Sequence, residues 1–325
     1  MAYTLPTTVD ALMELADRVS NVGRWGERDQ MGTANLIDAA AVLRGVHAVR
    51  SGRSFSLAIP LDERGPMTTG AAGRFNPHHY MIRSGGDALS GAMVAHYWGG
   101  KDPLIRSFDD VILMPLQSGT QWDGLAHISH GDRLYNGYPI SSISSWGAEY
   151  LGIETVSNSL CSRAFLVDAP LMRGVEYLDA EDAIGYEDLD RWMRDHSLVA
   201  QPGDILLIRT GWLLKAKREG WGSYAGGAAP GLSLDCLLWL REHDIAAVAA
   251  DTFSVEIRPF ALPDVIVPFH LVALCYMGLF LGEIFDLDDL AADCQIDGQY
   301  EGFLAAAPLP VTGGIGSPIN PMFFK

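Results

Sequence analysis

Apolar runs that alternate with helical patterns in the second half of the 325-residue chain constrain its fold most strongly. The segments 162–168, 203–211 and 245–250 each have a continuous apolar centre. Amphipathic patterns over 180–196 and 233–243 separate them. Strands that are apolar on both faces belong to a sheet whose two faces are covered, and the intervening helices supply the cover. We therefore predict an α/β fold with a mixed or parallel sheet and flanking helices.

The N-terminal part is less regular. Residues 1–60 are predicted to form an irregular, helical extension with a helix over 38–50, followed by a first strand at 54–60. Residues 65–86 are rich in glycine, proline, asparagine and histidine, which predicts a long loop near a pocket. No linker rich in proline, glycine and serine is long enough to divide the chain, so we expect 1–325 to form one domain.

The composition excludes two classes of partner. The chain has 23 Lys and Arg against 40 Asp and Glu, a net charge of −17, so we expect it to bind neither nucleic acid nor an anionic membrane. The N-terminal residues lack the basic segment and apolar run of a signal peptide, so we expect none. The most apolar stretch, 271–282, is too short to span a bilayer. Four widely spaced cysteines without C-x-x-C spacing predict reduced thiols in a cytoplasmic protein. The partner that we expect is a small-molecule substrate.

The stretch 116–130, LQSGTQWDGLAHISH, concentrates polar groups that can act in chemistry. It follows a strand-like apolar run at 111–115 and bends at 118–120. A strand that ends in a tight bend and then displays an acid and an imidazole commonly aims ligands into a cleft. The structural alternative is the capped start of a helix with an ordinary surface histidine. The candidates in this stretch are Gln117, Gln121, Asp123 and His127.

His270 and Glu283 bracket the segment 271–282, which is too apolar for a surface helix. A buried carboxylate and a buried imidazole need partners, because an unpaired buried charge is costly. Each other, or a metal ion, would serve. A divalent ion suits Asp123 and Glu283 as oxygen ligands and His270 as a nitrogen ligand, and it lowers the pKa of a bound water to about 7. His127 could then act as general base and acid. The structural alternative is a salt-bridged Glu283 with His270 on the surface.

The motif at 118–127 and several later segments resemble the sequence pattern of a known protein family. The chain looks like a member of the cyclase family that includes bacterial kynurenine formamidases and isatin hydrolase, whose usual pattern is H-x-G-T-H-x-D-x-P-x-H. The resemblance implies a swivelling β/β/α fold and metal-dependent hydrolysis of an amide, a formamide or a lactone. The segments that carry it extend through most of the chain: 118–127 (SGTQWDGLAH), 134–137 (LYNG), 203–212 (GDILLIRTGW), 251–256 (DTFSVE), His270, 282–287 (GEIFDL) and 314–321 (GIGSPINP).

Carried over position by position, the resemblance assigns His127 as the catalytic acid and base beside Asp123. Both metal-binding histidines of the family pattern are glutamine here, and a glutamine carbonyl is a poor ligand for zinc. Either the site holds an oxygen-preferring ion such as manganese, magnesium or calcium, or it holds no catalytic metal. We favour the retained ion and expect no organic cofactor. The metal ligands predicted on this basis are Gln117, Gln121, Asp123, His270 and Glu283.

The leading hypothesis is a hydrolase that uses a metal-activated water to cleave an aryl formamide, a cyclic amide or a lactone. One alternative is metal-free acid/base catalysis by a cyclase, isomerase or dehydratase, with the glutamines bound to substrate. Another is a non-catalytic small-molecule binding protein on the same scaffold. Because family members commonly associate, we expect a homo-oligomer. Candidate substrate-binding residues near the motif are Trp122, Tyr135, Trp98 and His79.

Overall fold

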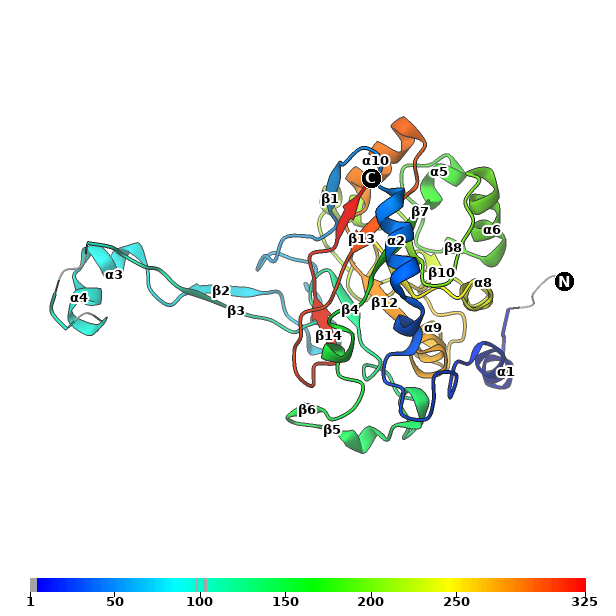
Figure 1. The fold of residues 1–325 in the computed structure, drawn as a ribbon, viewed down its shortest axis with the longest axis horizontal. Coiled ribbons are helices and arrows are strands. Elements are labelled where there is room, and N and C mark those ends of the chain that lie inside the picture. The colour runs from blue at the N-terminus through cyan, green and yellow to red at the C-terminus, as the bar shows by residue number, and fades with distance from the viewer. Residues whose placement is uncertain (1–4, 98, 102–103) are drawn as a thin grey trace.

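A nine-stranded mixed sheet forms the centre of the protein (Figure 1). The computed structural model describes residues 5–97, 99–101 and 104–325. The predicted α/β fold with a mixed sheet and flanking helices is confirmed. Across the sheet the strands follow the order β1 (Ser54–Ser56), β15 (Met322–Phe324), β13 (Glu301–Ala305), β7 (Cys161–Asp168), β9 (Ile205–Arg209), β11 (Ala247–Ala250), β12 (Phe280–Glu283), β4 (Gln121–Asp123) and β14 (Gly316–Pro318).

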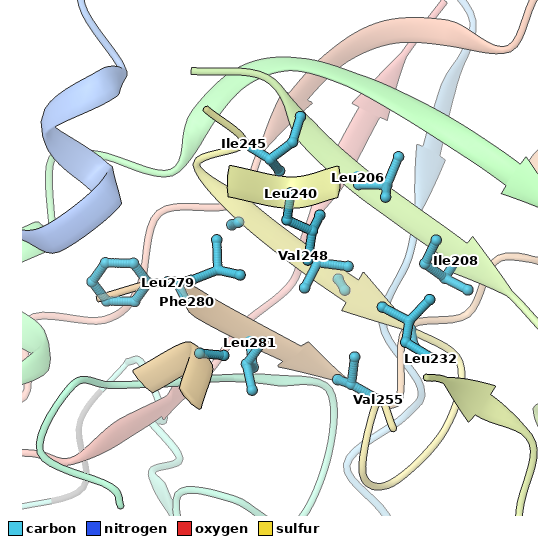
Figure 2. Close-up of a cluster of buried hydrophobic side chains, with 14 of the residues drawn as sticks. Leu206, Ile208, Leu232, Leu240, Ile245, Val248, Val255, Leu279, Phe280 and Leu281 are labelled. Atoms are coloured by element: carbon cyan, nitrogen blue, oxygen red, sulfur yellow. The ribbon is translucent and has the colours of Figure 1, made fainter. Parts of the chain in front are cut away.

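Four adjacent parallel strands, β7, β9, β11 and β12, form the buried centre of the sheet. Every residue of β9, β11 and β12 is buried, as continuous apolar runs predict. Figure 2 shows Leu206 of β9, Val248 of β11 and Leu281 of β12 in one apolar cluster, and all three are fully buried. Full burial of such a side chain contributes roughly 1.5–3 kcal/mol to the free energy of unfolding.

Helices cover the sheet and connect its strands. Helix α2 (Ala39–Ala48) packs across β7 and β13. Gly45 allows this close approach, because a Cβ there would lie 2.6 Å from Phe303 Cδ2 and 2.7 Å from Arg163 N. The helix predicted over 38–50 is thus present as α2, and it packs on the main sheet. The other helices of the main body are α1 (Val9–Val19), α5 (Ala169–Arg173), α6 (Tyr186–Asp195), α7 (Trp212–Glu219), α8 (Cys236–Glu242), α9 (Pro268–Val272) and α10 (Asp288–Asp297).

Shorter elements complete the body. Two short strand pairs lie outside the nine-stranded sheet. Strands β8 (Ala183–Ile184) and β10 (Gly231–Leu232) are parallel, and β5 (Ile143–Ser144) and β6 (Gly147–Ala148) are antiparallel. No helix within the described residues is long and apolar enough to cross a membrane. The four cysteines are unpaired thiols. Single helical turns of the 3-10 type lie at Gly32–Leu36, Ala71–Gly73, Tyr135–Gly137, Ile140–Ser142 and Ile153–Val156, and a π-helical turn at Ala273–Met277.

Residues 78–113 form an arm that projects far from the body (Figure 1). Strands β2 (His78–Met81) and β3 (Asp110–Leu113) pair antiparallel as a separate ribbon, and α3 (Gly85–Leu89) and α4 (Ala92–Tyr97) lie at its tip. The structure differs from two predictions. Part of the expected loop 65–86 is strand β2, and the apolar run at 111–115 begins in β3 of the arm, which is not a strand of the central sheet. Composition misleads here because an exposed apolar ribbon has the same pattern as a buried strand.

Candidate active site

A buried group of ligating side chains lies where β4 and β12 pair. Their antiparallel register places Gln121 opposite Glu283 and Asp123 opposite Leu281. Because alternate residues of a strand share a face, Gln121, Asp123 and Glu283 all point to the same side. Gln121 Nε2 donates to Glu283 Oε2 over 2.8 Å and lies 3.4 Å from Asp123 Oδ1. Strand register alone thus brings three predicted site residues together.

Helix α9 adds the imidazole of His270 to this group, and Glu256 holds the ring in place. His270 Nδ1 lies 2.6 Å from Glu256 Oε1, and the same carboxylate accepts the backbone N–H groups of Phe269 and His270. His270 Nε2 faces the other way, 3.3 Å from Glu283 Oε1 and 3.7 Å from Asp123 Oδ2. One ligating atom each from Asp123, His270 and Glu283 therefore lie within 4.8 Å of one another.

The charged side chains of the buried group shift one another's pKa values. Burial alone would lower the pKa of His270, but hydrogen bonds to Glu256 and Glu283, with the charges of both, raise it to about 10. Burial and the nearby charge of Asp123 raise the pKa of Glu283. At neutral pH the imidazolium of His270 therefore offsets part of the negative charge that surrounds it.

His127 stands at the edge of this group with a neutral imidazole. Its Nε2 lies 3.9 Å from Asp123 Oδ1 and 3.5 Å from Arg74 Nη2, while its buried Nδ1 has no hydrogen-bond partner within the described structure. Burial lowers the pKa of His127, and the charges of Arg74 and His270 lower it further against the opposing charge of Asp123. Because Arg74 can only donate, its approach favours a lone pair on Nε2. Such an imidazole is suited to accept a proton.

The backbone beside the group is strained at three points. Val255, Val267 and Ile284 have φ values of 55°, 48° and 59°, a region that β-branched residues rarely adopt. Val255 precedes Glu256, Val267 begins the turn into α9, and Ile284 follows Glu283. Each such conformation costs roughly 1–3 kcal/mol and persists only where surrounding packing enforces it. Strain that gathers around one cluster is typical of a functional site.

A pocket of about 350 Å³ opens onto the buried group. This volume lies at the lower end of the range of small-molecule sites, roughly 300–1,000 Å³. Its polar lining consists of Arg74, His127, Ser254, Arg258, His270 and Glu283. Its apolar lining consists of Ala71, Ala72, Ile128, Phe253, Phe260, Ile266 and Val267.

Comparison with known proteins identifies the family. Residues 55–257, more than half of the chain, match the family described as Putative cyclase. The chain belongs to this family. A crystal structure of a novel cyclase is 39% identical to it, with a TM-score of 0.86 over 95% of this chain and 99% of that chain. The resemblance predicted from the sequence is thus confirmed. No curated protein sequence matches the chain.

Two isatin hydrolases have a similar fold at low sequence identity. Isatin hydrolase A from Labrenzia aggregata, bound to benzyl benzoate, is 17% identical, with a TM-score of 0.59 over 87% of this chain and 96% of that chain. Isatin hydrolase A from Ralstonia solanacearum is 20% identical, with a TM-score of 0.56 over 88% and 94% of the two chains. At these identities the comparison demonstrates a shared fold.

Gln117 and Gln121, the two glutamines of the motif, have different surroundings. Gln121 belongs to the buried group, and its Oε1 is buried without a hydrogen-bond partner in the described structure. Gln117 accepts a hydrogen bond from Arg74 Nη1 through its backbone oxygen, at 3.2 Å. Its side-chain Nε2 packs against Gly316, where a Cβ would approach it to 2.5 Å, and has no partner there. Only Gln121 contacts the other predicted ligands.

The donor set of the buried group fits one hard divalent ion. Asp123 and Glu283 offer carboxylate oxygens, and His270 offers Nε2 while Glu256 holds its Nδ1, the arrangement in which histidine commonly binds a metal. A half-turn of the Gln121 amide would aim its unpartnered Oε1 at the same point. Three oxygens and one nitrogen favour magnesium, calcium or manganese over zinc. A bound ion would replace the proton on His270 Nε2.

Two predicted substrate-binding residues lie in the core, away from the pocket. Trp122 is fully buried, and its Nε1 donates to the backbone oxygen of Ala306 over 2.7 Å. Tyr135 is also fully buried and donates its hydroxyl to Asp29 Oδ2 over 3.1 Å. Large aromatic side chains next to a motif are mostly structural, because their apolar area stabilises the strand that carries the motif.

The other two predicted substrate-binding residues belong to the arm sequence. The exposed His79 pairs with Asp110 across the ribbon at 2.7 Å and is not among the residues that line the pocket. Trp98 lies outside the described residues. The aromatic lining of the pocket comes instead from Phe253 and Phe260.

Sequence reasoning missed three charged residues of the site. Glu256 lies in the segment 251–256 that carries the family resemblance, but the resemblance gives no role for this residue. Arg74 and Arg258 are single arginines in irregular segments, with no motif around them. Only the folded chain brings them to the pocket.

Proposed function

We propose that this protein is a hydrolase that opens a cyclic amide or a lactone, or cleaves an aryl formamide. The observation that supports it is the position of His127, a neutral imidazole that adjoins Asp123 and lines the same pocket as His270 and Glu283. A water held there would face both a proton acceptor and a charged ligand group. The isatin hydrolases that share the fold are named for isatin, a cyclic amide, which agrees with this class of bond.

We propose that Asp123, His270 and Glu283 hold one divalent ion, with Gln121 as an adjoining oxygen donor. When bound, such an ion polarises a carbonyl oxygen and lowers the pKa of a water to about 7. Gln117 is the weakest of the predicted ligands, because its amide packs against Gly316.

His127 is the group that moves protons. As the oxygen of water bonds to the carbonyl carbon of the substrate, Nε2 accepts the proton that the water releases. The imidazolium then returns this proton to the leaving nitrogen or oxygen as the C–N or C–O bond breaks, so the residue ends the cycle neutral. Arg74 disfavours the imidazolium and promotes the return of the proton, while Asp123 stabilises the charge as it forms.

One observation favours the metal-free alternative, in which the same residues catalyse a cyclisation, isomerisation or dehydration. The Gln121 amide already donates to Glu283 and approaches Asp123, and His270 Nε2 lies 3.3 Å from Glu283 Oε1. These contacts satisfy the carboxylates without an ion. Elemental analysis of purified protein that has never met a chelator separates the two proposals. A stoichiometric divalent ion, lost together with activity on chelation, supports the hydrolase.

The His127→Ala variant tests the assigned role. We expect it to keep the fold and the ion but to lose turnover by about 10²–10⁴-fold, the usual contribution of general acid/base catalysis. Suitable substrates are formyl-kynurenine, isatin-like lactams and unsaturated lactones. His130→Ala is a matched control, because His130 is exposed and contacts Tyr276 instead of the buried group. Equal turnover in the His127 variant and the control would exclude this role.

A further inference from the structure

We infer that the pocket takes substrates that carry a carboxylate, and that Arg258 binds this group. The inference rests on the proposed function for the bond that is cleaved, but it concerns another part of the substrate. Two guanidinium groups line the pocket, those of Arg74 and Arg258, in a chain whose net charge is −17. Arg74 is already engaged with His127 and lies 4.0 Å from Glu283 Oε2.

Arg258 is the less engaged of the two guanidinium groups that line the pocket. It forms no ion pair within 4.0 Å with a carboxylate of the described residues, and its guanidinium donates from Nη2 to the backbone oxygen of Gly226 over 2.9 Å. The side chain is half-buried, so it has lost part of its hydration, and the carboxylates of Glu283 and Glu256 act on it only from beyond ion-pair distance. A ligand carboxylate would supply both the charge and the acceptors, because the planar guanidinium fork matches two carboxylate oxygens.

Aromatic rings hold Arg258 in place for such a contact. Its Cζ lies 5.4 Å from the ring centre of Phe260 and 5.8 Å from that of Phe253. Both distances fall within the range of cation–π attraction, which orients the guanidinium without neutralising it. The hydrogen bond to Gly226 fixes one edge of the fork and leaves its other N–H groups available. A preorganised donor loses less entropy on binding than a mobile lysine would.

The rest of the pocket indicates what the carboxylate is attached to. Apart from the charged residues and Ser254, the lining is apolar, with Ile128, Phe260 and Val267 among its members. A cavity of about 350 Å³ with this lining suits a compact ring system of one or two rings. The substrate class is thus a small cyclic or aryl amide, formamide or lactone that bears an acid group.

The test compares two probes that differ only in charge, 2-naphthoate and 2-naphthamide. Isothermal titration calorimetry measures their affinity for the intact protein and for Arg258→Gln, Arg258→Lys and Arg133→Gln. Arg133 is exposed and pairs with the adjacent Asp132, so its variant is the control for a lost positive charge. Circular dichroism and the melting temperature establish that each variant is folded.

We expect naphthoate to bind the intact protein at least tenfold more tightly than naphthamide. Arg258→Gln should weaken naphthoate at least tenfold and change naphthamide less than twofold, and Arg258→Lys should fall between because it loses the bidentate contact. The Arg133 variant should resemble the intact protein. Equal affinities for the two probes, no binding of naphthoate, or an equal loss of both probes in Arg258→Gln would overturn the inference. Because these assays measure binding, they remain informative whether or not His127 proves to be the catalytic base.

Discussion

Glu256 determines which nitrogen of His270 faces the rest of the site. Its carboxylate accepts two consecutive backbone N–H groups at the start of α9 and contacts Nδ1 at 2.6 Å. The ring is thereby aimed at Asp123 and Glu283 through Nε2. In metal sites such a partner fixes the tautomer of the histidine and increases its basicity. Glu256 thus acts as a positioning residue.

Replacing Glu256 by glutamine should weaken the binding of a divalent ion about 10–100-fold, the usual effect of losing a carboxylate behind a histidine ligand. The amide can still accept one of the two backbone N–H groups, so the protein should fold with a lower melting temperature. Titration of chelated, dialysed protein with Mn²⁺ measures the affinity directly. The exposed Glu63→Gln serves as a charge-matched control. Unchanged Mn²⁺ affinity would rule out a positioning role.

Single residues of the site could be predicted to the extent that the chain pattern constrains them. Asp123 and His127 belong to one motif, and the burial of His270 and Glu283 follows from the apolar segment between them. Arg258 could not be found in this way, because a lone arginine carries no periodicity. Trp122 shows the converse error, since proximity in sequence to Asp123 does not imply the same face: alternate residues of a strand point to opposite sides.

At the scale of elements, strand β12 depends on a residue without a side chain. Gly282 lies opposite Ala249 of β11 and Trp122 of β4. A Cβ at this position would lie 2.5 Å from Ala249 Cβ and 2.6 Å from Trp122 Cζ3. Side chains of the two neighbouring strands therefore fill the space beside Gly282. This packing fixes the position of Glu283, the next residue.

The Gly282→Ala variant should lower the free energy of unfolding by about 1–3 kcal/mol, the usual cost of an extra group in a well-packed core. Urea denaturation measures the change. Gly85→Ala provides the control, because a Cβ at Gly85 would meet no atom within 4 Å and the residue lies in a helix, where alanine is favoured. A cost below about 0.5 kcal/mol for Gly282→Ala would mean that the strands can separate without penalty.

An ion pair joins the turn after α1 to the end of α8. Arg24 donates to both carboxylate oxygens of Asp244, over 2.6 and 2.7 Å. This hydrogen bonding lowers the pKa of Asp244 below its ordinary value. A carboxylate with a lowered pKa stabilises the fold above the unfolded-state pKa, about 3.9, and this contribution is lost as the pH falls through the folded-state value.

Arg24→Gln should therefore lower the free energy of unfolding at pH 7 by at most about 1 kcal/mol, since both groups are partly exposed to solvent. The difference from the intact protein should shrink as the pH falls below about 3.9, where the unfolded chain takes up the proton, and should disappear below the folded-state pKa of Asp244. Urea unfolding of both proteins at pH 7, 4, 3 and 2.5 follows this trend. A difference that is constant over the series would indicate lost packing of the arginine stem instead of a lost ion pair.

Elements could be predicted where burial dictates the pattern. The runs at 203–211 and 245–250 are apolar because β9 and β11 are covered on both faces. The run at 111–115 has the same composition, yet β3 is exposed along its length. An apolar run indicates that the strand's surface is buried in a contact. It does not tell whether helices of the same chain or another molecule form that contact.

At the scale of the whole molecule, the arm of residues 78–113 is the surface left uncovered (Figure 1). An isolated two-stranded ribbon is at best marginally stable in water. Contiguous apolar surface on such an element marks an interaction site. The exposed apolar residues of the arm include Tyr80, Met81, Ile82, Leu89, Leu104, Ile105, Phe108, Val111, Ile112 and Leu113.

We predict that a second copy of this chain covers the arm. Residues 78–113 hold three basic and four acidic residues, so the body carries nearly all of the net charge of −17. Low charge is typical of the centre of an interface. An apolar groove of about 440 Å³, lined by Ile59, Leu61 and Ile319 among others, lies beside Thr120, close to where the chain returns from the arm. In a two-fold dimer each arm can lie against the groove of its partner.

A shortened variant tests this prediction. Replacing residues 80–111 by Asn-Gly joins His79 to Ile112, which are paired in the ribbon, through a favoured two-residue turn. Light scattering after size-exclusion chromatography should give at least twice 35.3 kDa for the intact chain and one chain for the variant. The double substitution L104D/I105D, at positions exposed in the single chain, should also give one chain. An intact protein of 35.3 kDa at 50 μM, or a shortened variant that still associates, would contradict the prediction. Because Arg258 and the other residues that line the pocket lie outside the deleted segment, the shortened protein should still bind 2-naphthoate, which separates the arm's role in association from the chemistry of the pocket.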